Sequence, residues 1–368
     1  MKYSQNISVA YRIPILMMGL TCLAFGIASG LFRLGWNFPL PSTSIVAFHG
    51  PLMVCGFLGT VISLERAVAI AKRWAYLGPL TAALGGLAFI LELNWRIGAS
   101  LITLASGILT IATVHILIRQ RELFNLTLLL ACLSWLLGNI LWLGGLTISQ
   151  VAPWWLGFLV LTIAGERLEL SRFLPTSSAS RVAFMLIVLL FLIGALVATL
   201  SSDLNVKILS AALLALALWL LRQDIARHTI KQNGLSRFIA VCLMSGYLWL
   251  IVGGLVGLLS TKLIPNSSYD AFMHAIMVGF VFSMIFGHAP IIFPAVAKVK
   301  IPYHPTFYQP LIVLHVSLIV RIAGDLMPDQ LCRSIGGALN GIALLLFLLS
   351  TVIATFRSKK QNTYPANR

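Results

Sequence analysis

The stretch MHAIMVGFVFSMIFGHAPIIF, residues Met273–Phe293, decides the class of this protein. It is apolar apart from Ser283 and two histidines, His274 and His288, and it contains no lysine, arginine or acidic residue. A helix of about 20 such residues is long enough to cross the hydrocarbon core of a bilayer. The stretch therefore predicts a transmembrane helix. Its histidines need an explanation, because ionisable groups inside a membrane usually serve a function.

The rest of the chain has the same character. Of its 368 residues, 59% are hydrophobic and 10% are charged, whereas a soluble domain has about 25% charged residues. We expect an all-α polytopic transmembrane bundle of twelve spans, forming a single integral membrane domain over residues 1–368, with the first span retained. The expected spans are Ile13–Phe32, Ile45–Ile70, Tyr76–Leu93, Gly98–Ile118, Leu126–Leu146, Ala152–Leu170, Val182–Leu200, Val206–Leu221, Phe238–Leu259, Ala271–Phe293, Phe307–Gly324 and Leu331–Thr355.

The net charge of +16 fits a membrane protein better than a nucleic-acid-binding protein. The basic residues are spread over short loops, and short cytoplasmic loops are enriched in lysine and arginine. With the N-terminus in the cytoplasm, twenty basic residues fall on the cytoplasmic side. Five fall on the opposite side, namely Arg33, Arg96, Lys207, Lys262 and Arg333. This bias predicts that both termini are cytoplasmic.

The cysteines predict neither a disulfide nor a cysteine metal site. Each lies in a separate apolar run, and no CxxC motif occurs. A buried free cysteine behaves as a small hydrophobic residue. The five are Cys22, Cys55, Cys132, Cys242 and Cys332.

Two histidines are expected at equal depth on two different spans. His49 lies about one turn into the second span, and His274 lies about one turn into the tenth. Ligation of one heme iron by two imidazoles requires such a pair, so heme, of b type, is the expected cofactor. The neighbouring glycines would let the flat ring approach the backbone; they are Gly50, Gly56, Gly59 and Gly279. The alternative is two unrelated histidines that form hydrogen bonds to helix backbones.

Arg321 is expected inside the eleventh span, in the same layer as these histidines. A buried arginine needs an anion. A heme propionate and the nearby carboxylate of Asp325 are equally good partners on sequence grounds, so Arg321 is a candidate heme-binding residue.

A second metal site is predicted deeper in the membrane. His288 follows His274 by fourteen residues, which places both on one helix face about 21 Å apart. One iron cannot bind both, so His288 would need other ligands. His315 and His115 are the candidates, and the metal would be copper or the iron of a second heme. The alternative is that these histidines only make polar contacts between packed helices.

Two motifs resemble those of the NnrS family, twelve-span bacterial proteins that are distantly similar to subunit I of heme-copper oxidases. The motifs are FHGPLMVCGFLGTVI, residues 48–62, and MHAIMVGFVFSMIFGH, residues 273–288. The resemblance implies a heme protein of the bacterial inner membrane, linked to nitric oxide or nitrosative stress, with His49 and His274 as heme ligands. The chain has no adjacent histidines, which argues against a dioxygen-reducing heme-copper centre.

Two other functions fit the sequence besides that of an NnrS-like heme protein. The sequence does not predict whether the protein is an enzyme. One is a b-type cytochrome that takes electrons from quinol or from a donor protein. The other is a heme-free transporter that uses its membrane histidines. Only one acidic residue inside a span, Glu92, lies away from a cytoplasmic end, which favours heme over transport.

The predicted orientation can be tested with reporter fusions. A fluorescent protein fused to the C-terminus should fluoresce, and alkaline phosphatase at the same position should be inactive, because both termini are predicted to be cytoplasmic. Phosphatase fused after Lys262, in a predicted outer loop, is the control and should be active. Active phosphatase at the C-terminus would mean that the number of spans is odd.

Overall fold

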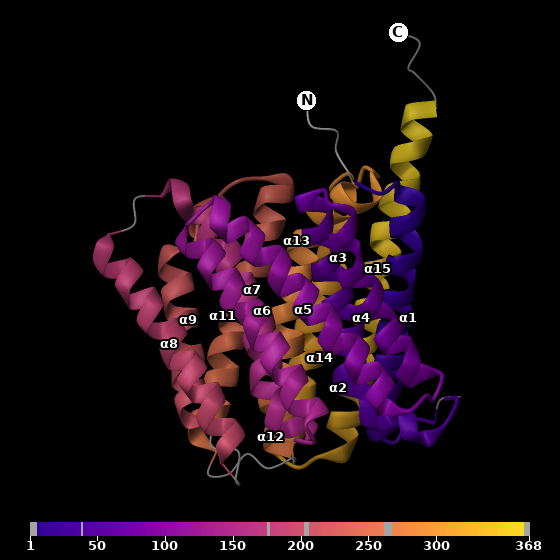
Figure 1. Ribbon diagram of the computed structural model, residues 1–368, viewed down its shortest axis with the longest axis vertical. Helices are drawn as coiled ribbons and strands as arrows, with labels where there is room; N and C mark the ends of the chain where they lie inside the picture. Colours follow the sequence, from indigo (N-terminus) through magenta and orange to yellow (C-terminus); the bar gives the residue numbers. More distant parts are fainter. Residues whose placement is uncertain (1–5, 38–39, 175–176, 202–205, 261–266, 364–368) are drawn as a thin grey trace. The chain divides into compact units, whose positions relative to one another are not determined.

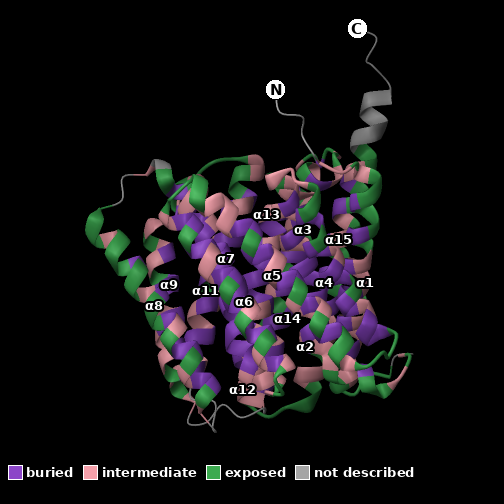
Figure 2. Ribbon diagram, in the orientation of Figure 1, coloured by how far each residue is buried: buried purple, intermediate pink, exposed green. Residues whose placement is uncertain are grey.

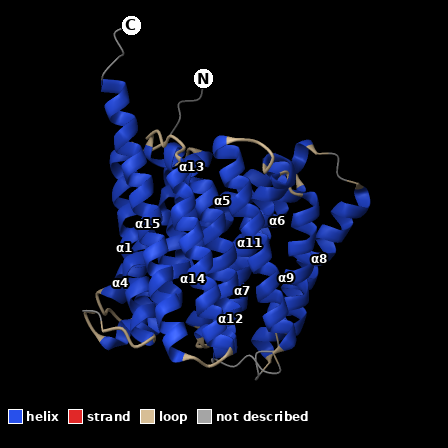
Figure 3. Cartoon of the chain, turned by 180° about the vertical axis from the view of Figure 1, so that it is seen from behind, coloured by secondary structure: helices blue, strands red, loops and turns tan. Residues whose placement is uncertain are grey.

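The computed structural model describes all residues except 1–5, 38–39, 175–176, 202–205, 261–266 and 364–368. Every regular element in the described part is a helix, which confirms the all-α prediction (Figure 3). The chain divides into two compact units, the first unit Met1–Leu209 and the second unit Ser210–Arg368. Each unit is described by itself.

Ten helical segments of the described chain are long and apolar enough to cross a membrane. They identify a multi-pass membrane protein with the lipid bilayer as its environment. Each corresponds to one of the predicted spans. They are Val9–Arg33, Thr43–Ile70, Trp95–Arg119, Leu123–Leu143, Ile148–Leu170, Ser178–Leu200, Gly234–Leu259, Ser267–Ala297, Pro305–Leu326 and Gln330–Arg357.

The other two predicted spans are shorter helices. The third is α4 (Leu77–Ile90), with 14 residues, and the eighth is α9 (Lys207–Gln223), with 17. At 1.5 Å per residue their lengths are about 21 Å and about 26 Å, less than the roughly 30 Å of a hydrocarbon core. One 3₁₀ turn, η3 (Arg73–Tyr76), directly precedes α4. The count of twelve spans therefore stays a prediction.

The first unit begins with α1 (Val9–Arg33) and a composite second span (Figure 1). Consecutive helices pack on one another from α4 to α8. Residues 151–165 in the sixth span are all buried, so this helix lies in the interior (Figure 2). The remaining elements are η1 (Thr43–Phe48), α2 (His49–Pro51), η2 (Leu52–Leu58), α3 (Gly59–Ile70), α5 (Trp95–Arg119), α6 (Leu123–Leu143), α7 (Ile148–Leu170) and α8 (Ser178–Leu200).

Small residues bring three helices of the first unit into close contact. A Cβ on Gly86 of α4 would lie 2.4 Å from Cys22 Sγ of α1 and 3.1 Å from Gly56 Cα of η2. Such contacts let helix backbones approach closely, and this close packing drives helix association in a membrane.

The second unit follows a similar plan. After α9 and the short α10 (Ala226–Thr229), α11 (Gly234–Leu259) packs along the composite tenth span. Its glycines again make the contact: a Cβ on Gly253 would lie 2.7 Å from Ile276, and one on Gly257 would lie 3.0 Å from Phe272. The remaining elements are α12 (Ser267–His274), η5 (Ala275–Phe282), α13 (Ser283–Ala297), η6 (Pro305–Phe307), α14 (Tyr308–Leu326) and α15 (Gln330–Thr363).

The two units share an order of elements that amounts to an internal repeat. Each has a helix of 25 or 26 residues, α1 or α11, followed by a span that contains a histidine and a π-helical segment. Each of these spans ends at a non-glycine residue with positive φ, Ala71 (φ 56°) or Lys298 (φ 52°). A 3₁₀ turn and two further helices come next, α4 and α5 or α14 and α15.

The two prolines of the tenth span do not break its helix. Proline inside a helix usually breaks or kinks it, yet α13 continues through Pro290 and Pro294 to Ala297. Proline removes one helical hydrogen bond, and in a membrane helix local adjustment can compensate for that loss.

The three-helix contact at Gly86 predicts a sharp difference between two glycines. Gly86→Ala should lower the melting temperature in detergent by several degrees, because the new methyl group would overlap Cys22 and overpacking costs about 1–3 kcal/mol. Gly107→Ala in α5 is the control, since its Cβ would meet nothing within 4 Å, and the better helix propensity of alanine should leave stability equal or higher. Equal melting temperatures for the two variants would contradict the contact.

Candidate functional site

His49 begins the α-helical part of the second span, directly after the 3₁₀ turn η1. Its Nδ1 lies 2.7 Å from the carbonyl oxygen of Gly26 in α1. A carbonyl can only accept, so Nδ1 carries the proton and the lone pair of the neutral ring is on Nε2. A Cβ on Gly30 would lie 2.8 Å from the ring, so only glycine there lets the imidazole lie against α1.

His274 has the same tautomer in the second unit. Its Nδ1 lies 2.7 Å from the carbonyl oxygen of Asp270, one turn earlier in α12. Metal-bound histidines usually donate their other ring N–H to a carbonyl or carboxylate, which fixes the ring and its tautomer. Both histidines therefore present the nitrogen that a heme iron would bind.

The two histidines also lie at similar depths along their own spans. His49 is the seventh residue of a segment that begins with a 3₁₀ turn at Thr43, and His274 is the eighth of an α-helical segment that begins at Ser267. With rises of about 2.0 Å and 1.5 Å per residue, these positions are about 12 Å and 10.5 Å from the starts of the spans.

A π-helical segment follows each histidine. η2 starts three residues after His49, and η5 starts immediately after His274. No other π-helical segment occurs in the described ranges. π-helices are rare and are frequently found at functional sites. The sequence carries no pattern from which we could have predicted them.

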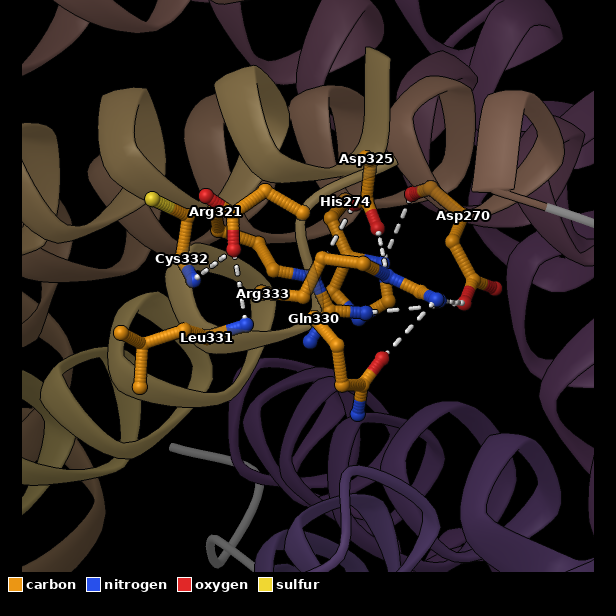
Figure 4. A network of polar contacts seen from close by, with 9 residues as sticks. Asp270, His274, Arg321, Asp325, Gln330, Leu331, Cys332 and Arg333 are labelled. Carbon is orange, nitrogen blue, oxygen red and sulfur yellow. Dashed lines mark hydrogen bonds and ion pairs between the residues drawn. The ribbon is translucent and has the colours of Figure 1, made fainter. Parts of the chain in front are cut away.

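Four charged side chains form a closed network beside His274 (Figure 4). Arg321 Nε donates to Asp325 Oδ2 at 3.0 Å, and Arg333 Nε donates to Asp325 Oδ1 at 2.6 Å. Asp270 Oδ2 lies 3.5 Å from Arg321 Nη2 and 3.1 Å from Arg333 Nη2. Two carboxylates thus balance two guanidinium groups, which satisfies the need of buried charges for partners.

Two partners were expected for Arg321, a heme propionate and Asp325. The protein itself supplies Asp325. Arg321 and Asp325 are 3% and 1% exposed, and the carboxylate of Asp325 is the observed anion. Contact of Arg321 with a heme propionate stays a prediction. Arg333, which the charge pattern placed in an outer loop, was not recognised as part of this site.

Asp270 links the network to His274. Its side chain binds both arginines, while its backbone carbonyl accepts the proton of His274 Nδ1. The ion pairs therefore hold the helical turn that orients this imidazole, and α12, α14 and α15 meet there.

The expected inner-site histidines differ from one another. Nδ1 of His288 lies 2.7 Å from the carbonyl oxygen of Met284 and donates to it, so His288 has the same tautomer as His49 and His274. In contrast, His315 Nδ1 accepts from Trp249 Nε1 at 2.9 Å, so its proton is on Nε2 and no lone pair is left for a metal. His115 lies on α5 in the first unit, and its Nε2 is buried without a partner.

No group of three or more His, Cys, Asp or Glu side chains in the described part of the chain is placed to hold a metal ion. The inner site of His288, His315 and His115 therefore stays a prediction, and the protonation of His315 argues against a ligand role for that residue.

The glycines expected to admit a heme ring contact protein side chains instead. A Cβ on Gly56 would meet Cys22, one on Gly59 would meet Trp135, and one on Gly279 would meet Trp249. The nearest atom to a Cβ on Gly50 belongs to Ile148, at 3.7 Å. Gly56, Gly59 and Gly279 thus serve helix packing.

Cys55 in η2 belongs to a buried polar network that the sequence did not reveal. Its Sγ accepts from Trp135 Nε1 at 3.3 Å and lies 3.8 Å from Asn139 Oδ1. The same oxygen accepts from Trp155 Nε1 at 2.9 Å. All five cysteines are free thiols.

The sequence pattern of a family described as "Domain of unknown function (DUF8744)" matches residues 12–356. The chain belongs to this family. The matched region contains both histidines that begin the π-helical spans, together with the network around Asp270. No curated protein matches the chain.

The buried network predicts a large loss of stability on removal of one charge. Asp325→Asn should lower the free energy of unfolding by about 3–5 kcal/mol, because the buried Arg321 and the half-buried Arg333 would then share one carboxylate. Unfolding by a denaturing detergent measures it. Glu169→Gln is the control, since the pair of Glu169 with Arg172 is 3.9 Å long and exposed and contributes about 1 kcal/mol or less. Similar losses in the two variants would show that the network does not stabilise the unit.

Proposed function

We propose that this protein is a heme-binding membrane protein of the NnrS type, with His49 and His274 as the axial ligands. The observation that carries the proposal is the shared arrangement of these residues. Each comes one or three residues before a π-helical segment and donates Nδ1–H to a backbone carbonyl at 2.7 Å. Two such imidazoles in one chain are the donor set of a low-spin b-type heme.

The histidines are prepared for this role before any heme arrives. The carbonyl oxygens of Gly26 and Asp270 fix the tautomers, so no proton has to leave either ring on ligation. Gly30 fixes the position of the His49 ring, and the ion pairs of Asp270 hold the turn of His274. Preorganised ligands bind more tightly because less conformational freedom is lost on binding.

A bound heme would supply an iron that exchanges single electrons, and nitric oxide would bind that iron only by displacing one of the two imidazoles. The proposed role is in nitric oxide or nitrosative-stress chemistry in a bacterial inner membrane. The NnrS-like motifs at residues 48–62 and 273–288 support this role, as do the ten apolar helices.

The ligand assignment can be tested by single substitutions. His49→Ala and His274→Ala should each abolish the low-spin heme spectrum of the purified protein, because each removes one of the two iron–nitrogen bonds. His304→Ala is the control: the His304 side chain is exposed and forms its hydrogen bonds with Thr306 in its own turn, so heme content should not change. Wild-type heme content and band shape in both membrane variants would refute the assignment.

A further inference from the structure

His315 is one of the membrane histidines that the proposed heme site does not use, and its neighbour Trp249 fixes which ring nitrogen carries the proton. Trp249 Nε1 lies 2.9 Å from His315 Nδ1. An indole N–H can only donate, so Nδ1 accepts and the proton of the neutral imidazole is on Nε2. The ring therefore offers a hydrogen-bond donor.

This donor has no acceptor in the described structure. His315 Nε2 is buried and makes no hydrogen bond to any described residue. A buried donor without an acceptor destabilises the protein, so a ligand that accepts its proton would bind favourably. His315 is the eighth residue of α14, about 10.5 Å from its start, which places it in the central part of the span, away from the polar interfaces.

The position of the donor is rigid. Trp249 packs so closely on Gly279 of η5 that a Cβ there would lie 2.4 Å from the indole ring. The Trp249 and His315 rings lie 26° from parallel, with centroids 6.4 Å apart. The donor thus has a fixed direction, because the indole that orients it is held against the π-helical segment η5.

His315 lies at the edge of the exposed face of α14. On one side of it are Ile312, Val316 and Ile319, which are 58%, 52% and 59% exposed. On the other side are Leu311, Leu314 and Leu318, which are buried. A ligand can therefore reach this region from within the bilayer.

We propose that Trp249 and His315 form a binding site for a lipophilic quinone, whose ring carbonyl oxygen accepts the proton of His315 Nε2–H. The acceptor must be neutral, because a free anion pays a large desolvation cost in hydrocarbon. The ester carbonyls of lipids stay near the headgroups, whereas a quinone carries its carbonyl groups on an apolar molecule that dissolves in the bilayer. The site would bind a redox partner of the membrane and does not rest on the heme proposal.

Binding can be measured on the full-length protein in lipid nanodiscs. Decylubiquinone, a short-chain quinone, should quench the tryptophan fluorescence saturably. His315→Phe should weaken the binding roughly tenfold, since one hydrogen bond of about 1.4 kcal/mol corresponds to that factor. His315→Gln retains an N–H donor and should bind within a few-fold of wild type.

His115→Phe is the matched control, because His115 also has a buried Nε2 without a partner but lies on α5 in the first unit. Its binding should equal that of wild type. Non-saturable quenching, or unchanged affinity in His315→Phe, would overturn the proposal.

A second measurement needs no variant and holds even where His315→Phe does not fold. A quinone with a photoreactive group should label α11 and α14 of the wild-type protein, and excess decylubiquinone should prevent the labelling. Labelling confined to other helices would also overturn the site.

Discussion

Inside a bilayer, a polar group can be satisfied only by another group of the protein or by a ligand. This constraint explains the positions of the membrane histidines. His49, His274 and His288 each donate Nδ1–H to a backbone carbonyl at 2.7 Å. The same bond that satisfies one nitrogen determines that the other presents a lone pair. The charges of Arg321 and Arg333 are satisfied in the same way, by Asp325 and Asp270.

The two histidine spans repeat one plan but orient their imidazoles by different means. In the first unit the acceptor of His49 is on a neighbouring helix, α1, and Gly30 leaves room for the ring. In the second unit the acceptor of His274 is on its own helix, and the side chain of that residue, Asp270, is tied to two arginines. A change in α1 should therefore affect only His49, whereas a change in the ion network should affect only His274.

The equal depth of His49 and His274 in the membrane stays a prediction. The class of the protein and its ten long spans could be predicted because hydropathy is a local property of a helix. The tautomers could not, since they depend on which carbonyl, such as that of Gly26, approaches from another helix. The role of the glycines was predicted wrongly for the same reason. Gly59 and Gly279 were expected to let a heme ring approach the backbone, yet Trp135 and Trp249 pack against them. The twelve-span count depends on α4 and α9. The predicted third span of 18 residues contains a helix of only 14, because polar residues and a turn flank it, and the predicted eighth span of 16 residues corresponds to a helix of 17.

The central claim is that His49 and His274 are preformed axial ligands of a heme. The most direct measurement is the heme content of wild-type protein purified from heme-replete cells, together with its oxidised and reduced optical spectra. We predict a single heme per chain with a low-spin spectrum of the bis-histidine type in both oxidation states. A folded protein that contains no heme and takes up none when hemin is added would contradict the claim.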